Sequence, residues 1–350
     1  MDQTQHYRRI LIRAANWVGD AVTTTPALRA VRRNFPDARI TLLAKPWVAP
    51  VFENNPDIDD IMMYAADGRH GGLGGMLRLA RDVRQHRFDL AILFPNAFSA
   101  ALMVFLAGVP QRMGFTTDGR GFLLNLRVPI RPQIKKEHLI DHYLGLIADA
   151  GFKTAGRKLA LAISPAEKTT AKNLLAHKGL TTDGPLVGFN PGAAFGTAKR
   201  WPAERFIELG RRLIDEQGAG VLIFGGPGER ELGEQIAAKI GLGSINLSGQ
   251  TTLRQAMALI GACNLFVTND SGLMHVAAAL DISQVVIIGP TNPIATGPAN
   301  PASQLVQVAD ACDLSPCLKP ECPTDHVCMT AVTTEQVLAA AEVALDRKKI

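Results

Sequence analysis

An apolar run that ends in a glycine-containing turn and leads into a helix recurs in this chain, and it restricts the fold more than any other feature. Three such units lie around residues 9–34, 186–216 and 263–280. Apolar runs of this length predict strands buried on both faces, and the alternation of strands with helices predicts parallel sheets. Because the chain has 350 residues, 47% of them hydrophobic, we expect an α/β fold with two doubly wound domains.

The segment Asn269–His275 joins the apolar run 263–268 to a small-residue helix predicted at 276–280. The first N–H groups of a helix have no partner within the helix, and the helix dipole favours negative charge there. Ser271 can cap this helix, and His275 can add a donor one turn later. The turn is therefore predicted to bind a diphosphate, although an ordinary capped turn between a strand and a helix is the alternative.

A second glycine-containing loop, Asn190–Pro202, follows an apolar run and precedes an amphipathic helix predicted at 203–216. Glycine allows a ligand to approach the backbone closely. Lys199 and Arg200 supply cations, the first as a point charge and the second as a planar fork suited to phosphate. A surface loop with a solvated basic pair is the alternative.

The N-terminal unit places Asp20 directly after a glycine, where the strand predicted at Arg9–Arg13 gives way to a helix. Ligands of open α/β sheets bind at the carboxyl ends of the strands, so a carboxylate there can act as a general base. A role for Asp20 as a helix cap is the alternative.

Together these motifs resemble the signatures of glycosyltransferase family 9, the ADP-heptose:lipopolysaccharide heptosyltransferases. The matching segments are Asn16–Val22 with Pro26–Leu28, Asn190–Pro202 and Asp270–His275. Trp17 and the block Lys199–Pro202 are more similar to the type II enzymes than to type I. The resemblance implies the GT-B fold, in which two Rossmann-like domains face each other, with the acceptor bound by the N-terminal domain and the nucleotide sugar by the C-terminal one.

The resemblance also implies an inverting transfer of L-glycero-D-manno-heptose from ADP-heptose to the lipopolysaccharide inner core. The expected product carries the second heptose, on heptosyl-Kdo2-lipid A. Asp20 is expected to take the proton of the acceptor hydroxyl, and Lys199 to stabilise the departing ADP. No cofactor is expected, and Asp270 either shapes its turn or contacts the sugar.

The binding residues implied for the two substrates lie in different halves of the chain. The donor is expected to contact Asn190, Gly192, Thr197, Lys199, Arg200, Gly225, Asp270, Ser271, Gly272, Leu273 and His275. The acceptor is expected to contact Asn16, Trp17, Lys45, Arg112 and Arg120.

Positive charge is concentrated in the first half. Residues 1–157 hold 21 Lys and Arg against 14 Asp and Glu, whereas residues 158–350 hold 16 against 18. A basic half indicates an anionic partner. Without a nucleic-acid motif or a basic stretch interleaved with aromatics, an anionic glycolipid is favoured over nucleic acid.

No apolar run approaches the roughly 20 residues that span a bilayer, and Met1–Tyr7 lacks the apolar core of a signal peptide. We therefore expect a cytoplasmic protein with peripheral contact at the cytoplasmic face of the inner membrane. A boundary predicted at 151–157 divides the chain into domains 1–157 and 158–332. The remaining segment, 333–350, is expected to be a helix that can pack back on the first domain.

Two further segments carry specific expectations. Four glycines within residues 71–75 predict a flexible loop before a helix at 76–85. Four cysteines, Cys312, Cys317, Cys322 and Cys328, lack the spacing of a zinc knuckle, so no metal is expected and a structural zinc is the alternative. Disulfides would be unusual in a reducing cytoplasm. We expect a loop that covers part of the nucleotide site.

Other activities remain open at this point. A type I enzyme would add the first heptose instead of the second, and a GT-B-fold epimerase would convert a nucleotide sugar without an acceptor. A sugar-binding protein without catalysis would not need Asp20. A Rossmann dehydrogenase is disfavoured, because residues 14–20 lack the G-x-G-x-x-G pattern.

Overall fold

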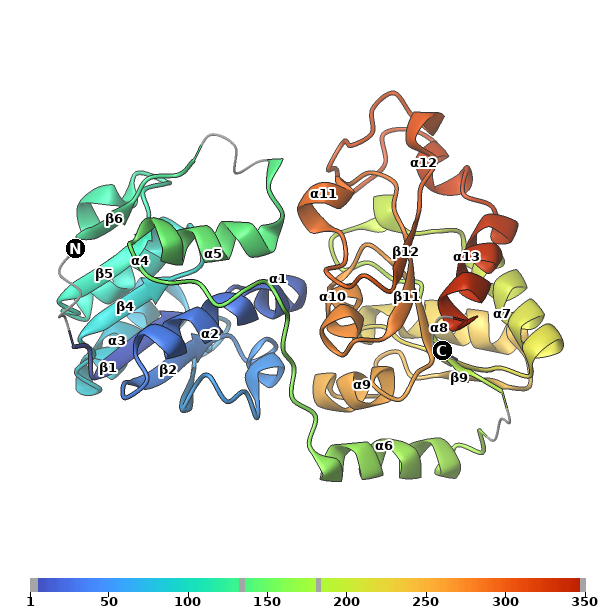
Figure 1. Cartoon of the computed structure of the whole chain (residues 1–350), viewed down its shortest axis with the longest axis horizontal. Coiled ribbons are helices and arrows are strands. Elements are labelled where there is room, and N and C mark those ends of the chain that lie inside the picture. Colours follow the sequence, from blue (N-terminus) through green and yellow to red (C-terminus); the bar gives the residue numbers. More distant parts are fainter. Residues whose placement is uncertain (1–5, 132–135, 181–183, 347–350) are drawn as a thin grey trace. The chain divides into compact units, whose positions relative to one another are not determined.

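The computed structural model describes residues 6–131, 136–180 and 184–346. The chain divides into two compact units, Met1–Ala162 and Ile163–Ile350. The first unit therefore ends at residue 162, whereas the sequence predicts an end at residue 157. Each unit is a parallel sheet with helices packed on it (Figure 1).

The sheet of the first unit has the strand order β3-β2-β1-β4-β5-β6. Its strands are β1 (Arg9–Arg13), β2 (Arg39–Ala44), β3 (Asp60–Met63), β4 (Leu90–Leu93), β5 (Gln111–Phe115) and β6 (Leu126–Val128). Its helices are α1 (Val18–Thr23), α2 (Thr25–Asn34), α3 (Gly72–Gln85), α4 (Phe98–Leu106) and α5 (Leu139–Asp149). Alternate strand residues such as Leu11 and Leu93 pack against Val83 of α3 and Val104 of α4.

The sheet of the second unit has the order β12-β11-β10-β7-β8-β9. Its strands are β7 (Leu186–Asn190), β8 (Gly220–Ile223), β9 (Ser244–Asn246), β10 (Leu265–Asn269), β11 (Ser283–Ile287) and β12 (Ser303–Val306). Its helices are α6 (Pro165–His177), α7 (Ala203–Gln217), α8 (Arg230–Ile240), α9 (Leu253–Ile260), α10 (Gly272–Ala279), α11 (Pro293–Thr296), α12 (Val327–Thr330) and α13 (Thr334–Asp346).

Both sheets have the same topology. Counted along the chain within each unit, the strand order is 3-2-1-4-5-6, the order of doubly wound dinucleotide-binding folds. The order reverses between the first and fourth strands, which are β1 and β4 in one unit and β7 and β10 in the other. Ligands of such sheets bind at this switch point, beyond the carboxyl ends of the strands.

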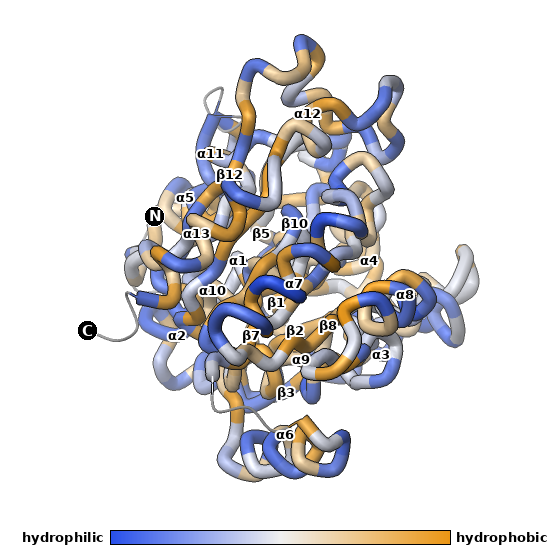
Figure 2. The backbone as a smooth tube through the Cα atoms, turned by 90° about the vertical axis from the view of Figure 1, so that its right-hand side faces the viewer, coloured by the Kyte–Doolittle hydropathy of each residue, from blue (hydrophilic) through white to orange (hydrophobic). Residues whose placement is uncertain are grey.

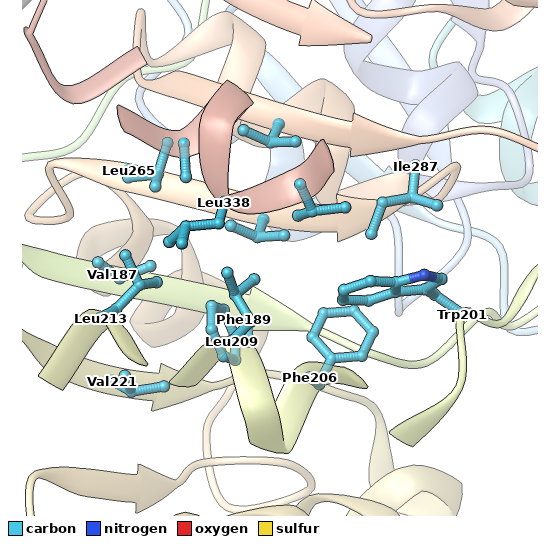
Figure 3. Packing of buried hydrophobic residues seen from close by; sticks show 14 of the residues in the cluster. Val187, Phe189, Trp201, Phe206, Leu209, Leu213, Val221, Leu265, Ile287 and Leu338 are labelled. Carbon is cyan, nitrogen blue, oxygen red and sulfur yellow. The ribbon is translucent and has the colours of Figure 1, made fainter. Parts of the chain in front are cut away.

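A large buried cluster holds the second unit together (Figure 3). Trp201 packs edge-on against Phe206 of α7, with 4.9 Å between ring centroids. Leu338 of α13 lies in the same cluster. The final helix therefore packs on the sheet of the second unit. The reason is its apolar face, which is buried against β11 and β12.

One local expectation differs from the structure, and two strands were missed. The predicted glycine loop at 71–75 is largely the first turn of α3, and a Cβ on Gly75 would lie 2.2 Å from the carbonyl carbon of His70. Gly71 and Gly75 therefore permit close packing of the backbone. The short edge strands β6 and β12 were not predicted, because each runs for only three or four residues without an apolar pattern.

Hydrophobic residues follow the strands of both sheets, and hydrophilic ones mark the outer turns of α7 and α8 (Figure 2). Within the described residues, no helix combines the length and apolar character needed to cross a membrane.

Candidate functional site

The two motifs of the second unit meet at its switch point, because β7 and β10 are paired neighbours. Asn190, the last residue of β7, is 3% exposed. Its side-chain amide donates to Ser271 Oγ at 2.6 Å and to Thr268 Oγ1 at 3.2 Å. Asn190 therefore holds the end of one strand against the turn that follows the other.

Asn269 forms a second connection between the two loops, a role that was not predicted from the sequence. Its side-chain amide donates to the carbonyl of Pro191 at 2.8 Å, and its Oδ1 accepts from the backbone N–H of Trp201 at 3.2 Å. The Trp201 indole in turn donates to the carbonyl of Val332 at 2.9 Å. The loop 190–202 is thus fixed at both ends. An asparagine at the end of a buried strand was the available signal.

Lys199 and Asp270 form an ion pair beside this turn. Lys199 Nζ lies 2.9 Å from Asp270 Oδ2, and the side chains are 16% and 7% exposed. The Thr296 hydroxyl donates to the same oxygen at 3.4 Å. Asp270 therefore shapes the turn by holding the lysine, which places a cation at the start of α10.

No side chain caps the start of α10, although Ser271 occupies the N-cap position. Ser271 has an extended backbone there, but its side chain makes no cap hydrogen bond, because Ser271 Oγ accepts from Asn190. The expectation that Ser271 caps the helix is therefore wrong. Gly272 and Leu273, the first two helical residues, are half-buried, and His275 is 5% exposed one turn later. N–H groups that lack a cap suit an anion.

Arg200, Gly192 and Gly225 surround Glu229, an acidic residue that was not predicted to belong to the site. Arg200 Nη2 lies 4.0 Å from Glu229 Oε1, and Glu229 Oε2 accepts from the N–H of Gly226 at 2.8 Å. A Cβ on Gly192 would lie 1.9 Å from Glu229 Oε1, and one on Gly225 would lie 3.0 Å from its Oε2. Both glycines are required for this close approach. The exposed Thr197 lies in the short turn before Lys199.

Asp20 lies in the first turn of α1, at the carboxyl end of β1 in the first unit. The residue before this helix is Trp17, so Asp20 does not occupy the capping position. Burial raises the pKa of the Tyr143 phenol, and the charge of Asp20 raises it further. Asp20 therefore lies close to the buried Tyr143 at the edge of the sheet where ligands bind.

Three of the predicted acceptor residues gather at the same edge. The Asn16 carbonyl accepts from the Trp47 indole at 3.0 Å, and Lys45 Nζ lies 4.7 Å from the centre of the Trp47 ring. Trp17 is 58% exposed. Trp47, which is 43% exposed, adds a second accessible aromatic face that the sequence analysis did not include.

Arg120 has a structural role instead of the predicted contact with the acceptor, whereas the half-buried Arg112 remains a predicted acceptor contact. Arg120 is completely buried, and its guanidinium donates to the carbonyls of Phe115 and Pro95. Burial lowers its pKa to about 10. Arg112 donates to three carbonyls, at 109, 110 and 123. The burial of Arg120 could not be predicted, because the sequence does not reveal which carbonyls a guanidinium can reach.

Cys312, Cys317 and Cys322 lie in the loop that precedes α12, and Cys328 lies in α12 itself. The structure describes all four as thiols. No group of three or more His, Cys, Asp or Glu side chains in the described ranges is arranged to hold a metal ion. The loop packs on the segment that carries Thr197 and Lys199, because the carbonyl of Pro320 accepts from the N–H of Ala198 at 3.1 Å. A Cβ on Gly196 would lie 2.1 Å from that carbonyl oxygen.

Comparison with known proteins places this geometry in context. The model of glycosyltransferase family 9 (heptosyltransferase) matches residues 76–328. Lipopolysaccharide heptosyltransferase 2 of Escherichia coli K12 is 34% identical over 313 residues, covering 86% of this chain and 88% of the relative. Lipopolysaccharide heptosyltransferase 3 of Escherichia coli is 22% identical over 285 residues, covering 79% of this chain and 82% of the relative.

The same similarity extends to a solved structure. The structure of E. coli ADP-heptose LPS heptosyltransferase II superposes with a TM-score of 0.83 at 30% identity, covering 98% of this chain and 100% of the other. The two doubly wound units therefore form the GT-B architecture.

Proposed function

The chain belongs to glycosyltransferase family 9, the heptosyltransferases, and on that premise we propose that it adds the second heptose to the lipopolysaccharide inner core. The donor is ADP-L-glycero-D-manno-heptose and the acceptor is heptosyl-Kdo2-lipid A. The observation that carries this proposal is the Lys199–Asp270 pair at the start of α10, where the two loops meet. The higher identity to heptosyltransferase 2 than to heptosyltransferase 3 supports the choice of the second transfer.

The donor diphosphate lies against the first N–H groups of α10, with Lys199 beside it. Three features support this placement: the uncapped helix start, the partly buried ion pair and the close packing of Gly192 and Gly225. A phosphate oxygen that approaches Lys199 can replace or share the contact with Asp270. Arg200 and Thr197 lie on the same loop and add donors to the leaving group.

The reaction is a single displacement at the anomeric carbon. The acceptor hydroxyl oxygen forms the new glycosidic bond as the bond from carbon to the diphosphate oxygen breaks, so the configuration inverts. Asp20 takes the hydroxyl proton, and ADP leaves with the bonding electron pair. Lys199 stabilises the negative charge that develops on the departing phosphate. No cofactor or metal takes part in this scheme, so a chelator is expected to leave the rate unchanged.

The acceptor is placed by the first unit, through Asn16, Trp17 and Lys45. A peripheral membrane contact at the cytoplasmic face of the inner membrane completes the proposal, since the acceptor is a glycolipid. Exposed apolar side chains on neighbouring elements support this contact: Leu73 and Leu77 on α3, Phe98 and Phe105 on α4, and Phe122 in the turn 120–123. Exposed arginines on α3 suit anionic lipid headgroups.

Flotation with vesicles tests the membrane contact. Leu77→Glu is expected to reduce binding to anionic vesicles, whereas Val343→Glu, at an exposed position of α13, is expected to have no effect. Equal binding by both variants would contradict the assignment of this face.

Mass spectrometry of the products tests the activity itself. ADP-heptose is supplied with two truncated core acceptors, one without heptose and one with a single heptose. A gain of one heptose on the second acceptor alone is the expected result. A gain on the first would indicate the type I transfer, and conversion of the nucleotide sugar without an acceptor would indicate an epimerase.

A further inference from the structure

The first unit contains a cavity of about 130 Å³ at the carboxyl edge of its sheet. Its wall includes Arg13 at the end of β1, Lys45 after β2, Tyr64 after β3, and Ser99 in the first turn of α4. The cavity therefore lies at the switch point of the first sheet, where doubly wound folds bind ligands. Of the predicted acceptor residues, Asn16 and Lys45 line it.

Arg13 places a buried positive charge in the wall of this cavity. It is 4% exposed, and its guanidinium donates to the carbonyl of Ala14 at 2.6 Å and to Asn16 Oδ1 at 2.7 Å. The guanidinium lies 4.9 Å from the centre of the Tyr64 ring. Burial lowers its pKa to about 10, so it keeps its charge at neutral pH. These contacts hold the guanidinium rigidly at the cavity.

The cations of the cavity have no acidic partner within the described part of the chain: no carboxylate there forms an ion pair with Arg13 or Lys45. A buried charge without a counter-charge is costly, and an anionic ligand offsets that cost. Helix α4, nine residues long, begins at the cavity with no side-chain cap. Its dipole adds to the positive potential.

We propose that this cavity binds one anionic group of the acceptor, either a sugar carboxylate or a phosphoryl group. The inference rests on the proposed function for the identity of the acceptor. The volume suits a group of this size, since a cavity of about 150 Å³ holds one benzene molecule. The fixed guanidinium of Arg13 and the lysine of Lys45 then contact the anion together, and the sugar that carries it lies at the mouth, near Trp47.

Two variants of one strand test the proposal. Lys45→Gln removes the cation at the carboxyl end of β2, and Arg39→Gln removes one at the amino end of the same strand, where it pairs with the exposed Asp60. Each is assayed with a de-acylated core oligosaccharide, with its carboxyl methyl ester and with its dephosphorylated form. Lys45→Gln is expected to raise the KM for the intact acceptor about tenfold with a smaller change in kcat, as one charged hydrogen bond is lost.

The acceptor derivatives identify the anion. The derivative that lacks the bound group is expected to raise the KM of the unmodified enzyme by a similar factor, and Lys45→Gln is expected to add nothing further with that derivative. Arg39→Gln is expected to behave as the unmodified enzyme throughout. The proposal is overturned if Lys45→Gln changes KM equally for all three acceptors, or if it leaves every KM unchanged.

A binding measurement separates this inference from the proposed function. The intact oligosaccharide, titrated without donor, is expected to change the fluorescence of Trp47, which lies beside Lys45. The charge-preserving variant Arg13→Lys and a Trp47→Phe control accompany the titration. Binding that depends on Lys45 without any heptose transfer would reject the proposed function alone. Transfer with binding that ignores Lys45 would reject the cavity alone.

Discussion

Replacing Lys199 by methionine tests two roles of this lysine. One is to neutralise Asp270, and the other is to stabilise the departing ADP. The side chains are 2.9 Å apart and 16% and 7% exposed, so the variant leaves a nearly buried carboxylate without its cation. Removing one partner of a fully buried pair costs about 3–5 kcal/mol. Because Lys199 is partly exposed and the Thr296 hydroxyl still donates to Asp270, we expect a loss of about 1–3 kcal/mol in the free energy of unfolding.

Turnover is expected to fall further than stability. Removing one group that stabilises developing negative charge lowers kcat by about 10²–10³-fold. Urea unfolding of the second unit and steady-state transfer kinetics measure the two effects. The double variant Lys199→Met with Asp270→Asn removes both charges together, so we expect it to recover most of the stability and none of the activity.

That double variant decides between the two roles. If it recovers the turnover of the unmodified enzyme, Lys199 acts only as a neutralising partner and the phosphate site lies elsewhere. If the single variant keeps full turnover, the assignment of Lys199 to the leaving group is refuted.

The remaining predictions concern the base, a glycine and a histidine. Asp20→Asn is expected to reduce transfer by about 10²–10⁴-fold, the usual range for general-base catalysis, while calorimetry shows ADP binding unchanged; retained turnover would remove Asp20 as the base. Gly192→Ala is expected to displace Glu229 and to destabilise the second unit by about 1–3 kcal/mol in urea unfolding, through overpacking. Gly228→Ala serves as the control, because no atom lies within 4 Å of the added Cβ. Burial lowers the pKa of His142 from 6.5 to about 4. The contribution of His142 to stability is therefore complete above pH 6.5 and is lost as the pH falls towards 4. A His142→Asn variant should show a flatter dependence of the urea midpoint on pH, and equal slopes would contradict this.

Much of the candidate site followed from local sequence. The turn around Asp270 and the loop that carries Lys199 each combine an apolar strand, small residues and polar side chains, and the structure joins them through Asn190. Their proximity was predictable, because parallel strands end at one edge of a sheet.

Other parts of the site depended on contacts between distant segments. Arg120 was predicted to contact the acceptor but is buried against carbonyls of its own unit. Arg13, the last residue of a predicted strand, lines a cavity to which segments after β1, β2, β3 and β4 contribute. Glu229 was missed because only the packing of Gly192 places it at the site.

The sequence alone determined the α/β class, the two-unit organisation and the motifs after β1, β7 and β10, because strand and helix periodicity and turn chemistry are local properties. The tertiary structure decided which motif residues are accessible, which cations have partners, and that α13 packs in the second unit. Those properties depend on the direction in which a side chain leaves the backbone and on what the fold places opposite it. Residues far apart in sequence supply those neighbours, so no local pattern records them.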